Sequence, residues 1–432
     1  MSLPDGCLIA FYGDDFTGSS AVMELLSFAG LPTELFLAPP DEADMARIAD
    51  LRGVGVAGVA RAHSPEWMEA HLPPIFEKLG RLGAPISQYK ICSTFDSSPR
   101  IGSIGKAIDL AAPVLGGAWH PFIVAAPSIH RYQFFGNLFA SADGVGYRID
   151  RHPTMSVHPS TPMDEGDVRL HLAKQTDKRI GLVDYFALRN GRGDAALEAA
   201  LADGAEIVAI DAIDEMSLAA AGKLIWDNRG ERLFCPSSQG LQYALLAYWR
   251  SIGLIGDPPP PKTAEPRPIA AVSGSCSPVT GRQIAWAEAK GFKGIPIDAT
   301  AAVDEVRWQQ VVEDATQRSA DALRDGSSTL VYTASGPGDP AIPALKAAIR
   351  DSGLSEDSVN ARIGAGLGAV LRALVEAGRI GRVAIAGGDT SGNAISELGV
   401  SSLRAEHELG PACSISRASS RENRIDGLEV AL

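Results

Sequence analysis

Two adjacent carboxylates, Asp14 and Asp15, follow the apolar run 8–12, where a buried strand would give way to a helix. Consecutive side chains point in different directions. One carboxylate could therefore accept a proton or hold a metal, while the other binds the hydroxyl groups of a polyol. Two glycines flank the pair and would let the backbone approach a ligand closely. The alternative is that Asp15 or Thr17 only caps the helix that follows.

Three loops in the second half of the sequence, 273–277, 332–339 and 387–392, place glycine beside serine, threonine or aspartate directly after an apolar run. At the start of a helix, such loops present main-chain N–H and hydroxyl groups to an anion. The first and third loops indicate a nucleotide site, and Ser335 in the second could contact a base or ribose. No GK[ST] motif is present, which argues against a P-loop enzyme. A capped helix or an ordinary turn is the alternative for each loop alone.

Basic side chains in the first half could neutralise an acidic substrate. Lys90 and Arg100 belong to a Ser/Gly-rich segment that follows an apolar run, and Arg131 and His158 lie in similar segments. Arginine can bind a carboxylate through two parallel hydrogen bonds. Solvated surface charges and a structural histidine are the alternatives. No HxH, HExxH or other metal-ligand spacing occurs, so no protein-bound metal is expected.

The composition restricts the class of partner. The net charge is −13, which argues against nucleic acid or an anionic membrane as a partner. No apolar run approaches the roughly 18 residues that a membrane span needs. Five scattered cysteines form no CxxC pair, a pattern typical of reduced thiols in a cytoplasmic protein. Acidic residues interrupt the N-terminal apolar region, so no signal peptide is expected.

The chain of 432 residues is too long for one ordinary core, which predicts two domains. The stretch GDPPPPKTAEPRP, residues 256–268, holds six prolines in thirteen residues and cannot form a helix or a central strand. We interpret it as a proline-rich linker between a domain at 1–255 and a domain at 269–432.

Both halves alternate short apolar runs with helical patterns. This alternation predicts an α/β protein in which each domain has a mainly parallel sheet flanked by helices. The expected strands are 8–12, 53–60, 88–92, 122–126, 180–183, 207–210, 269–272, 294–297, 329–333 and 382–386. The expected helices are 65–79, kinked or split by Pro73-Pro74, and 167–174, 278–290 and 363–377.

Four motifs occur in order over essentially the whole chain: GDDFTGS, HPSTPM with LAKQT, SGSCSPVT and AGGDTSG. In this combination the chain resembles the four-carbon acid sugar kinase family. The resemblance implies ATP- and Mg²⁺-dependent phosphorylation of a terminal hydroxyl of a small sugar acid, such as threonate, erythronate or 3-oxo-tetronate. It also implies that the N-terminal domain binds the sugar acid and the C-terminal domain binds the nucleotide.

The resemblance carries roles to particular positions. Asp14, Asp15 and Thr17 would lie at the sugar-acid site, with Asp15 favoured slightly over Asp14 as the group that orients or deprotonates the attacking hydroxyl. The chemistry of the residues themselves, rather than the resemblance, suggests that Lys90, Arg100 or Arg131 would neutralise the substrate carboxylate and that His158 could touch the substrate. The expected nucleotide contacts are Ser273, Ser275, Ser335, Gly387, Gly388, Asp389 and Thr390.

One motif departs from the family. The usual run Lys-Ile-Asp-Ser-Thr-Leu-Arg is here Lys-Ile-Cys-Ser-Thr-Phe-Asp, residues 90–96, with Cys92 and Asp96 at the two changed charged positions. The substrate is therefore open between a tetronate and a branched acid such as 3-oxo-isoapionate.

Two rival functions and the oligomeric state also stay open. An NAD(P)-dependent hydroxy-acid oxidoreductase would fit two α/β domains, but no GxGxxG follows an early strand. Fluorescence quenching by NAD(P)H would reveal it. A non-catalytic sugar-acid binding protein would bind the acid without consuming ATP. A homodimer is one of the assemblies the sequence allows.

Overall fold

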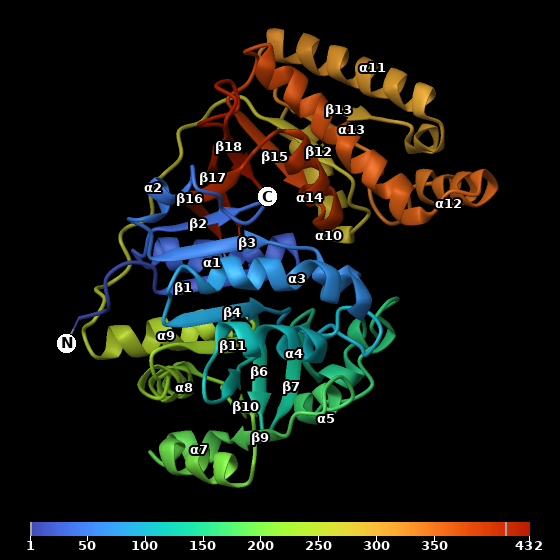
Figure 1. Cartoon of the computed structure of the whole chain (residues 1–432). Coiled ribbons are helices and arrows are strands. Elements are labelled where there is room, and N and C mark those ends of the chain that lie inside the picture. Colours follow the sequence, from blue (N-terminus) through green and yellow to red (C-terminus); the bar gives the residue numbers. More distant parts are fainter. Residues whose placement is uncertain (1, 411–412) are drawn as a thin grey trace. The chain divides into compact units, whose positions relative to one another are not determined.

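The computed structural model describes residues 2–410 and 413–432 (Figure 1). It divides into two compact units, Met1–Pro260 and Pro261–Leu432. Each unit has a mainly parallel sheet flanked by helices, which confirms the predicted fold class. None of the described helices is long and apolar enough to cross a membrane.

The larger sheet of the first unit carries the candidate chemistry at one edge. Its strands are β1 (Ile9–Gly13), β2 (Thr33–Phe36), β3 (Gly53–Ala57), β4 (Ile86–Lys90) and β11 (Leu233–Ser237). They run parallel in the order β11-β4-β1-β3-β2. Helices cover both faces, which explains why β1 is apolar throughout and fully buried.

The covering helices follow from right-handed crossovers between parallel strands. Helices α1 (Phe16–Phe28) and α9 (Gly240–Ser251) pack together on one face of this sheet, and α3 (Pro65–Gly80) and α4 (Ile104–Leu115) pack together on the other (Figure 1). A short helix, α2 (Met45–Ile48), precedes β3 in the sequence.

Two smaller sheets complete the first unit. One is parallel, in the order β5-β10-β9, and the other is an antiparallel meander, β6-β7-β8. Their strands are β5 (His120–Phe122), β6 (Arg131–Phe134), β7 (Asn137–Ala142), β8 (Val145–Arg148), β9 (Ile180–Val183) and β10 (Ile207–Ile210). The remaining helices are α5 (Val168–Leu172), α6 (Tyr185–Arg189), α7 (Gly193–Ala202) and α8 (Glu215–Asp227).

The second unit is built on parallel strands in the order β13-β14-β12-β15-β18, extended by the antiparallel strands β17 and β16. The strands are β12 (Ala270–Ser273), β13 (Lys293–Pro296), β14 (Thr329–Tyr332), β15 (Arg382–Ala386), β16 (Ser402–Gly410), β17 (Cys413–Ser419) and β18 (Glu429–Ala431). The helices are α10 (Pro278–Ala289), α11 (Glu305–Arg324), α12 (Ala341–Ser352), α13 (Glu356–Glu376) and α14 (Gly388–Glu397).

Of the two predicted effects of Pro73-Pro74, a kink or a split, the split is wrong, because helix α3 continues from Pro65 to Gly80. Ser64 caps it by accepting from the N–H of Trp67. Four apolar side chains along one face of this helix are buried, and this packing offsets the hydrogen bonds that the prolines cannot donate.

Strand β5 ends at Phe122, so the expected strand at 122–126 is wrong beyond its first residue. The N–H groups of the next two residues bind side chains, and Ala126 forms only an isolated antiparallel bridge with Arg131 at the start of β6. The N–H of Ile123 donates to the Ser237 hydroxyl, and that of Val124 donates to the Gln133 side chain.

Candidate functional site

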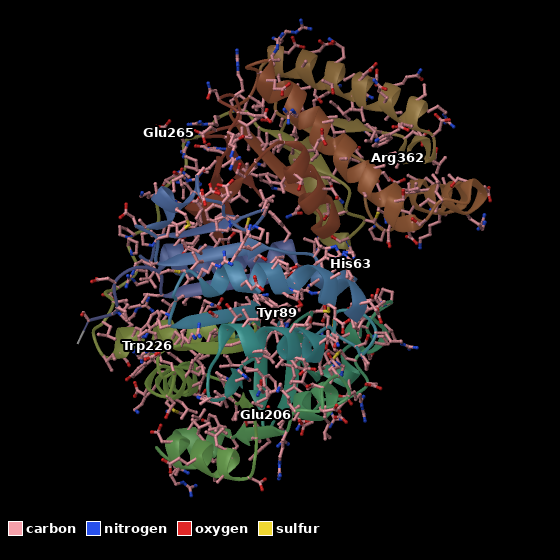
Figure 2. The ribbon with its side chains drawn as sticks, viewed as in Figure 1. His63, Tyr89, Glu206, Trp226, Glu265 and Arg362 are labelled. Atoms are coloured by element: carbon pink, nitrogen blue, oxygen red, sulfur yellow. The ribbon has the colours of Figure 1, made fainter. Side chains whose placement is uncertain are left out.

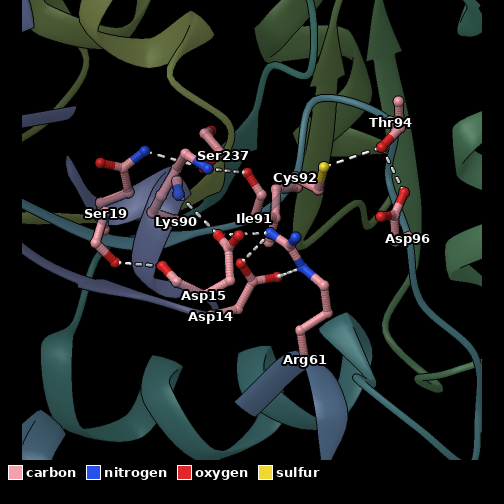
Figure 3. Close-up of polar contacts among 12 residues, drawn as sticks. Asp14, Asp15, Ser19, Arg61, Lys90, Ile91, Cys92, Thr94, Asp96 and Ser237 are labelled. Carbon is pink, nitrogen blue, oxygen red and sulfur yellow. Dashed lines mark hydrogen bonds and ion pairs between the residues drawn. The ribbon is translucent and has the colours of Figure 1, made fainter. Parts of the chain in front are cut away.

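A cluster of four charged side chains lies at one edge of the larger sheet in the first unit (Figure 3). Asp14 follows β1, Lys90 ends β4, and Arg61 lies in the short 3₁₀ helix Ala60–Ala62 after β3. The main chain fixes these ends together, since the Asp14 N–H donates to the Lys90 carbonyl at 3.0 Å and the Arg61 N–H donates to the Asp14 carbonyl at 3.0 Å. Parallel strands bring such loops to one edge, where ligands bind in open α/β sheets.

Arg61 joins the two carboxylates. Its Nη2 lies 2.6 Å from Oδ1 of Asp14 and 2.8 Å from Oδ1 of Asp15, and its Nε lies 3.3 Å from Oδ2 of Asp14. Asp14 is only 1% exposed. Burial raises the pKa of Asp14 from its ordinary value, while Arg61 and Lys90 oppose the rise and Asp15 adds to it. Burial alone would lower the pKa of Arg61, but the Asp14 carboxylate raises it well above its usual value.

Asp15 is the N-cap of α1, because its Oδ1 accepts from the Gly18 N–H at 3.0 Å. Asp15 therefore caps the helix, but capping is not its only contact, because the same carboxylate also contacts Arg61 and is 30% exposed. Thr17 lies exposed in the same first turn.

Gly18 is needed where the cluster is most crowded. A Cβ at this position would lie 2.3 Å from Oδ1 of Asp15 and 2.4 Å from Nζ of Lys90, so the ammonium and the carboxylate both lie against the glycine. Lys90 is 2% exposed, and its Nζ donates to the Ile91 carbonyl at 2.7 Å.

Aromatic and thiol groups surround the charged cluster. Tyr12 and Tyr89 stack with ring centroids 5.8 Å apart, and Tyr89 is labelled on β4 in Figure 2. Burial raises the pKa of both phenols and of the Cys92 thiol. The tyrosine hydroxyls and the thiol therefore stay protonated near neutral pH.

The structure does not join the other three predicted substrate residues to this cluster within the described chain. Arg100 is exposed in the loop before α4. Arg131 donates to the carbonyls of its neighbours Ile129 and His130, and Nδ1 of His158 accepts from the N–H of Thr161 at 3.2 Å. The last two side chains thus stabilise local turns.

Arg61 is the residue that the sequence prediction missed. It stands four residues after β3, and β3 neighbours β1 in the sheet. The sequence did contain a signal for this residue, because Arg61 comes directly after the strand expected at 53–60 and would therefore lie at the same sheet edge as Asp14.

In the second unit, the loop after β12 carries a chain of hydroxyl groups. The Ser275 N–H donates to the Ser273 hydroxyl at 3.3 Å, and the Thr280 hydroxyl donates to the Ser275 hydroxyl at 2.9 Å. Ser277 caps α10 by accepting from the Thr280 N–H at 3.1 Å. The loop therefore presents hydroxyl groups at the start of a helix, as an anion site requires.

Two further loops lie at the same sheet edge. Ser335 follows β14, and its N–H and hydroxyl donate to Asp339 at 2.7 and 2.8 Å. Gly387 follows β15 with φ 121°, a conformation that favours glycine, and precedes α14. The first turn of α14 comprises Gly388, Asp389 and Thr390, whose side chains lie outside the described part of the structure.

A cavity of about 310 Å³ lies beside these loops, within the second unit. The loops contribute Gly274, Ser275 and Gly387 to its lining. Much of the remainder is apolar and comes from Ala299, Ala334, Ala341, Ile342, Leu345, Ile349 and Ile363. Lys346, Glu356 and Asn360 add polar groups. An apolar slot beside glycine and hydroxyl groups suits a flat base attached to a phosphate chain.

A group of possible metal ligands elsewhere in the second unit is accounted for by ion pairs. Glu406, His407 and Glu429 bring their ligand atoms within 4.8 Å of one another. However, Arg417 holds both carboxylate oxygens of Glu406 at 2.7 and 2.6 Å, and Arg382 contacts Glu429 at 2.7 Å. These cations occupy the oxygens that a metal would need.

The arrangement defines a two-domain protein with a sugar-binding and a nucleotide-binding part. Residues 9–245 match the family model of a sugar-binding N-terminal domain, and residues 270–432 match that of a nucleotide-binding C-terminal domain. The fold also resembles the Haemophilus influenzae protein HI1011, with a TM-score of 0.72 and 21% identity over 98% of this chain and 95% of that chain.

Curated relatives match along the whole length. The chain is 47% identical to the 3-oxo-isoapionate kinase of Paraburkholderia graminis, covering 99% of this chain and 92% of the relative. It is 29% identical to the 3-oxo-tetronate kinase of Methylobacterium radiotolerans, covering 98% and 94%. The chain therefore belongs to the family of ATP-dependent sugar-acid kinases that combine these two domains, which confirms the resemblance found in its four motifs.

Proposed function

We propose that this kinase transfers the γ-phosphoryl group of ATP to a terminal hydroxyl of 3-oxo-isoapionate, a branched and oxidised sugar acid. The observation that carries the choice of substrate is the 47% identity to a 3-oxo-isoapionate kinase, against 29% to a 3-oxo-tetronate kinase, with nearly complete coverage in both comparisons. The departure at Cys92 and Asp96 from the usual run of the family leaves room for a substrate other than a tetronate.

The second unit would bind ATP. The apolar part of the cavity would accept the base, and Ser275 and Gly387, which line the cavity, would face the phosphates. Ser273 is buried, and its hydroxyl would support this loop by accepting from the N–H of Ser275. We extend this role to Ser335 and to the first turn of α14, residues 388–390. The first turn of α14 has main-chain N–H groups that suit phosphate oxygens, whereas Ser335 would have to exchange its hydrogen bonds to Asp339 for bonds to the nucleotide.

Mg²⁺ would enter with the nucleotide. The one described carboxylate tied to these loops, Asp339, already accepts hydrogen bonds from Ser335 and from the N–H of Ala341, so the triphosphate would be the main ligand of the ion. When bound, Mg²⁺ neutralises phosphate charge during transfer. A requirement for Mg²⁺ at constant ATP would support this role.

The first unit would position the acceptor, with Asp15 taking the proton. The Oδ1 atom of Asp15 accepts from Gly18 and Arg61, whereas no hydrogen bond within the described chain reaches its Oδ2. Both oxygens of Asp14 contact Arg61, so Asp14 holds the arginine. In the transfer, the substrate hydroxyl oxygen bonds to the γ-phosphorus, the bond to ADP breaks, and the hydroxyl proton passes to Asp15.

The deciding experiment is ADP release with Mg-ATP in the presence of 3-oxo-isoapionate, 3-oxo-tetronate, threonate and erythronate. We expect the highest kcat/KM with 3-oxo-isoapionate. Asp15→Asn should lower kcat by about 100-fold or more, since proton transfer contributes that much. Asp109→Asn, a matched change on the exposed side of α4, should leave kcat unchanged. Full turnover by folded Asp15→Asn would exclude the proton-acceptor role.

Further parts of the proposal have separate tests. Lys90 would bind the substrate carboxylate or its oxo group beside Asp15, and Arg100, Arg131 and His158 stay predicted substrate residues that alanine variants can check through KM. We place the protein in the cytoplasm because its five cysteines are free thiols. A homodimer is tested by light scattering.

A further inference from the structure

Asp96 is a buried carboxylate that no cation contacts within the described chain. It is 9% exposed, and its one hydrogen bond there is donated by the Thr94 hydroxyl to Oδ1. Its Oδ2 has no partner in the described residues. This oxygen is not among the fully buried atoms without a partner, so a ligand can reach it, and the single hydrogen bond of the side chain contributes little to the fold. We therefore expect the Asp96 carboxylate to have a role other than stabilising the fold.

The loop that carries Asp96 is held by contacts on both sides of that residue. Phe95 adopts φ 64°, a left-handed conformation that costs about 1–2 kcal/mol for an ordinary residue. The buried Phe95 ring stacks on Phe122 at 5.7 Å and offsets this strain. The next residue, Ser97, is held by His171 at 3.0 Å and by Gln175 at 2.9 Å. Asp96 is thus fixed in a defined direction.

The loop also connects to the charged cluster. Cys92 lies two residues after Lys90 and contacts the Thr94 hydroxyl at 2.9 Å, and Thr94 in turn contacts Asp96 (Figure 3). The Cys92 thiol lies in the combined field of Arg61, Asp96, Lys90 and Asp15. Asp96 and the proposed proton acceptor thus both lie within electrostatic range of one thiol, at the same edge of the sheet.

We propose that Asp96 binds a hydroxyl group on the branch of the sugar acid and so sets the preference for a branched over an unbranched substrate. This inference rests on the proposed function. A carboxylate accepts hydroxyl hydrogen bonds, whereas the arginine usual at this position in the family could only donate. Such a site discriminates against an analogue without the hydroxyl, because the buried acceptor is then left unpaired.

The test compares kcat and KM for 3-oxo-isoapionate and 3-oxo-tetronate in the wild type and in Asp96→Asn, with Asp109→Asn as the matched control. Asn retains an oxygen for Thr94 but replaces Oδ2 with a donor. We expect KM for 3-oxo-isoapionate to rise about tenfold or more. We expect KM for 3-oxo-tetronate to change much less, and the melting temperature to stay the same or rise. Equal effects on both acids, or none, would overturn the inference, as would a lower melting temperature without a change in preference.

A second variant and a binding measurement separate this inference from the proposed function. Thr94→Val removes the hydrogen bond that orients Asp96 and should shift the preference in the same direction by a smaller factor. Calorimetric titration of 3-oxo-isoapionate without ATP reports the site directly. If the wild type binds 3-oxo-isoapionate but does not phosphorylate it, and Asp96→Asn abolishes the binding, the hydroxyl site at Asp96 is supported and 3-oxo-isoapionate is excluded as the substrate of the kinase. If the wild type phosphorylates 3-oxo-isoapionate and Asp96→Asn binds it unchanged, the proposed function is supported and the hydroxyl site at Asp96 is excluded.

Discussion

Replacing Arg61 with glutamine should destabilise the first unit strongly. The side chain neutralises Asp14, which is 1% exposed, and it also contacts Asp15. Removing one partner of a buried ion pair costs about 3–5 kcal/mol, because the other charge stays buried. Arg61 is 23% exposed, so water can compensate in part and we expect about 3 kcal/mol. At about 2–4 °C per kcal/mol for a domain of this size, the melting temperature should fall by about 6–12 °C.

Urea unfolding of the full chain, followed by tryptophan fluorescence, measures this loss, and Arg100→Gln provides the control for losing an exposed arginine. Adding Asp14→Asn to Arg61→Gln should recover much of the stability, because the unpaired charge is then gone. A loss below about 1 kcal/mol, the range of exposed ion pairs, would refute the inference that Arg61 neutralises a buried carboxylate. Failure of the double variant to recover would show that Arg61 acts through packing instead.

Three other variants test the two sites. In Gly18→Ala the new Cβ would lie 2.3 Å from Oδ1 of Asp15 and 2.4 Å from Nζ of Lys90, so both side chains would have to move. We expect kcat/KM to fall by about 100-fold in steady-state assays. Unchanged activity would show that Gly18 is not needed for the positions of these two side chains. Because the folded pKa of Asp14 lies above its unfolded value, its contribution to stability is full below about pH 4 and is lost as pH rises through the folded pKa. The difference in unfolding free energy between the wild type and Asp14→Asn, measured in urea titrations, should therefore fall as the pH rises above about 4. A difference that grows with pH would contradict the sign that we assign. Leu345→Trp places a larger side chain in the cavity and should raise KM for ATP about tenfold or more. Binding of the sugar acid, measured by calorimetry, should stay the same. An unchanged KM for ATP would exclude this cavity as the site of the base.

The sequence was sufficient to predict the two-domain α/β fold and the position of Asp14 and Asp15. Buried parallel strands are continuous apolar runs, and the residues after them must gather at one sheet edge, so β1 and β4 could be placed from pattern alone. The pattern of apolar residues does not specify, in contrast, which strands lie next to each other in the sheet. The pairing of β3 with β1 brings Arg61 to Asp14, and that contact could be identified only from the structure.

Other errors arose where side chains replaced regular pairing. The expected strand 53–60 ends at Ala57, and the next residue, Gly58, lies so close to the Tyr12 ring that a Cβ would be 2.0 Å from Cζ. The antiparallel strands β16 and β17 were not predicted, since their alternating polar residues, such as the pair Glu406 and Arg417, are typical of exposed loops as well.

The ordered loop at residues 92–98 has a consequence for engineering the enzyme. Its backbone is held by Phe95, Ser97 and Gln175, none of which belongs to the proposed substrate contacts. Side chains at positions 92 and 96 can therefore be exchanged without rebuilding the loop that presents them. Libraries confined to these two positions should yield kinases with altered acceptor range at little loss of expression, whereas the same effort spent on Phe95 or Gln175 should yield mostly unfolded protein.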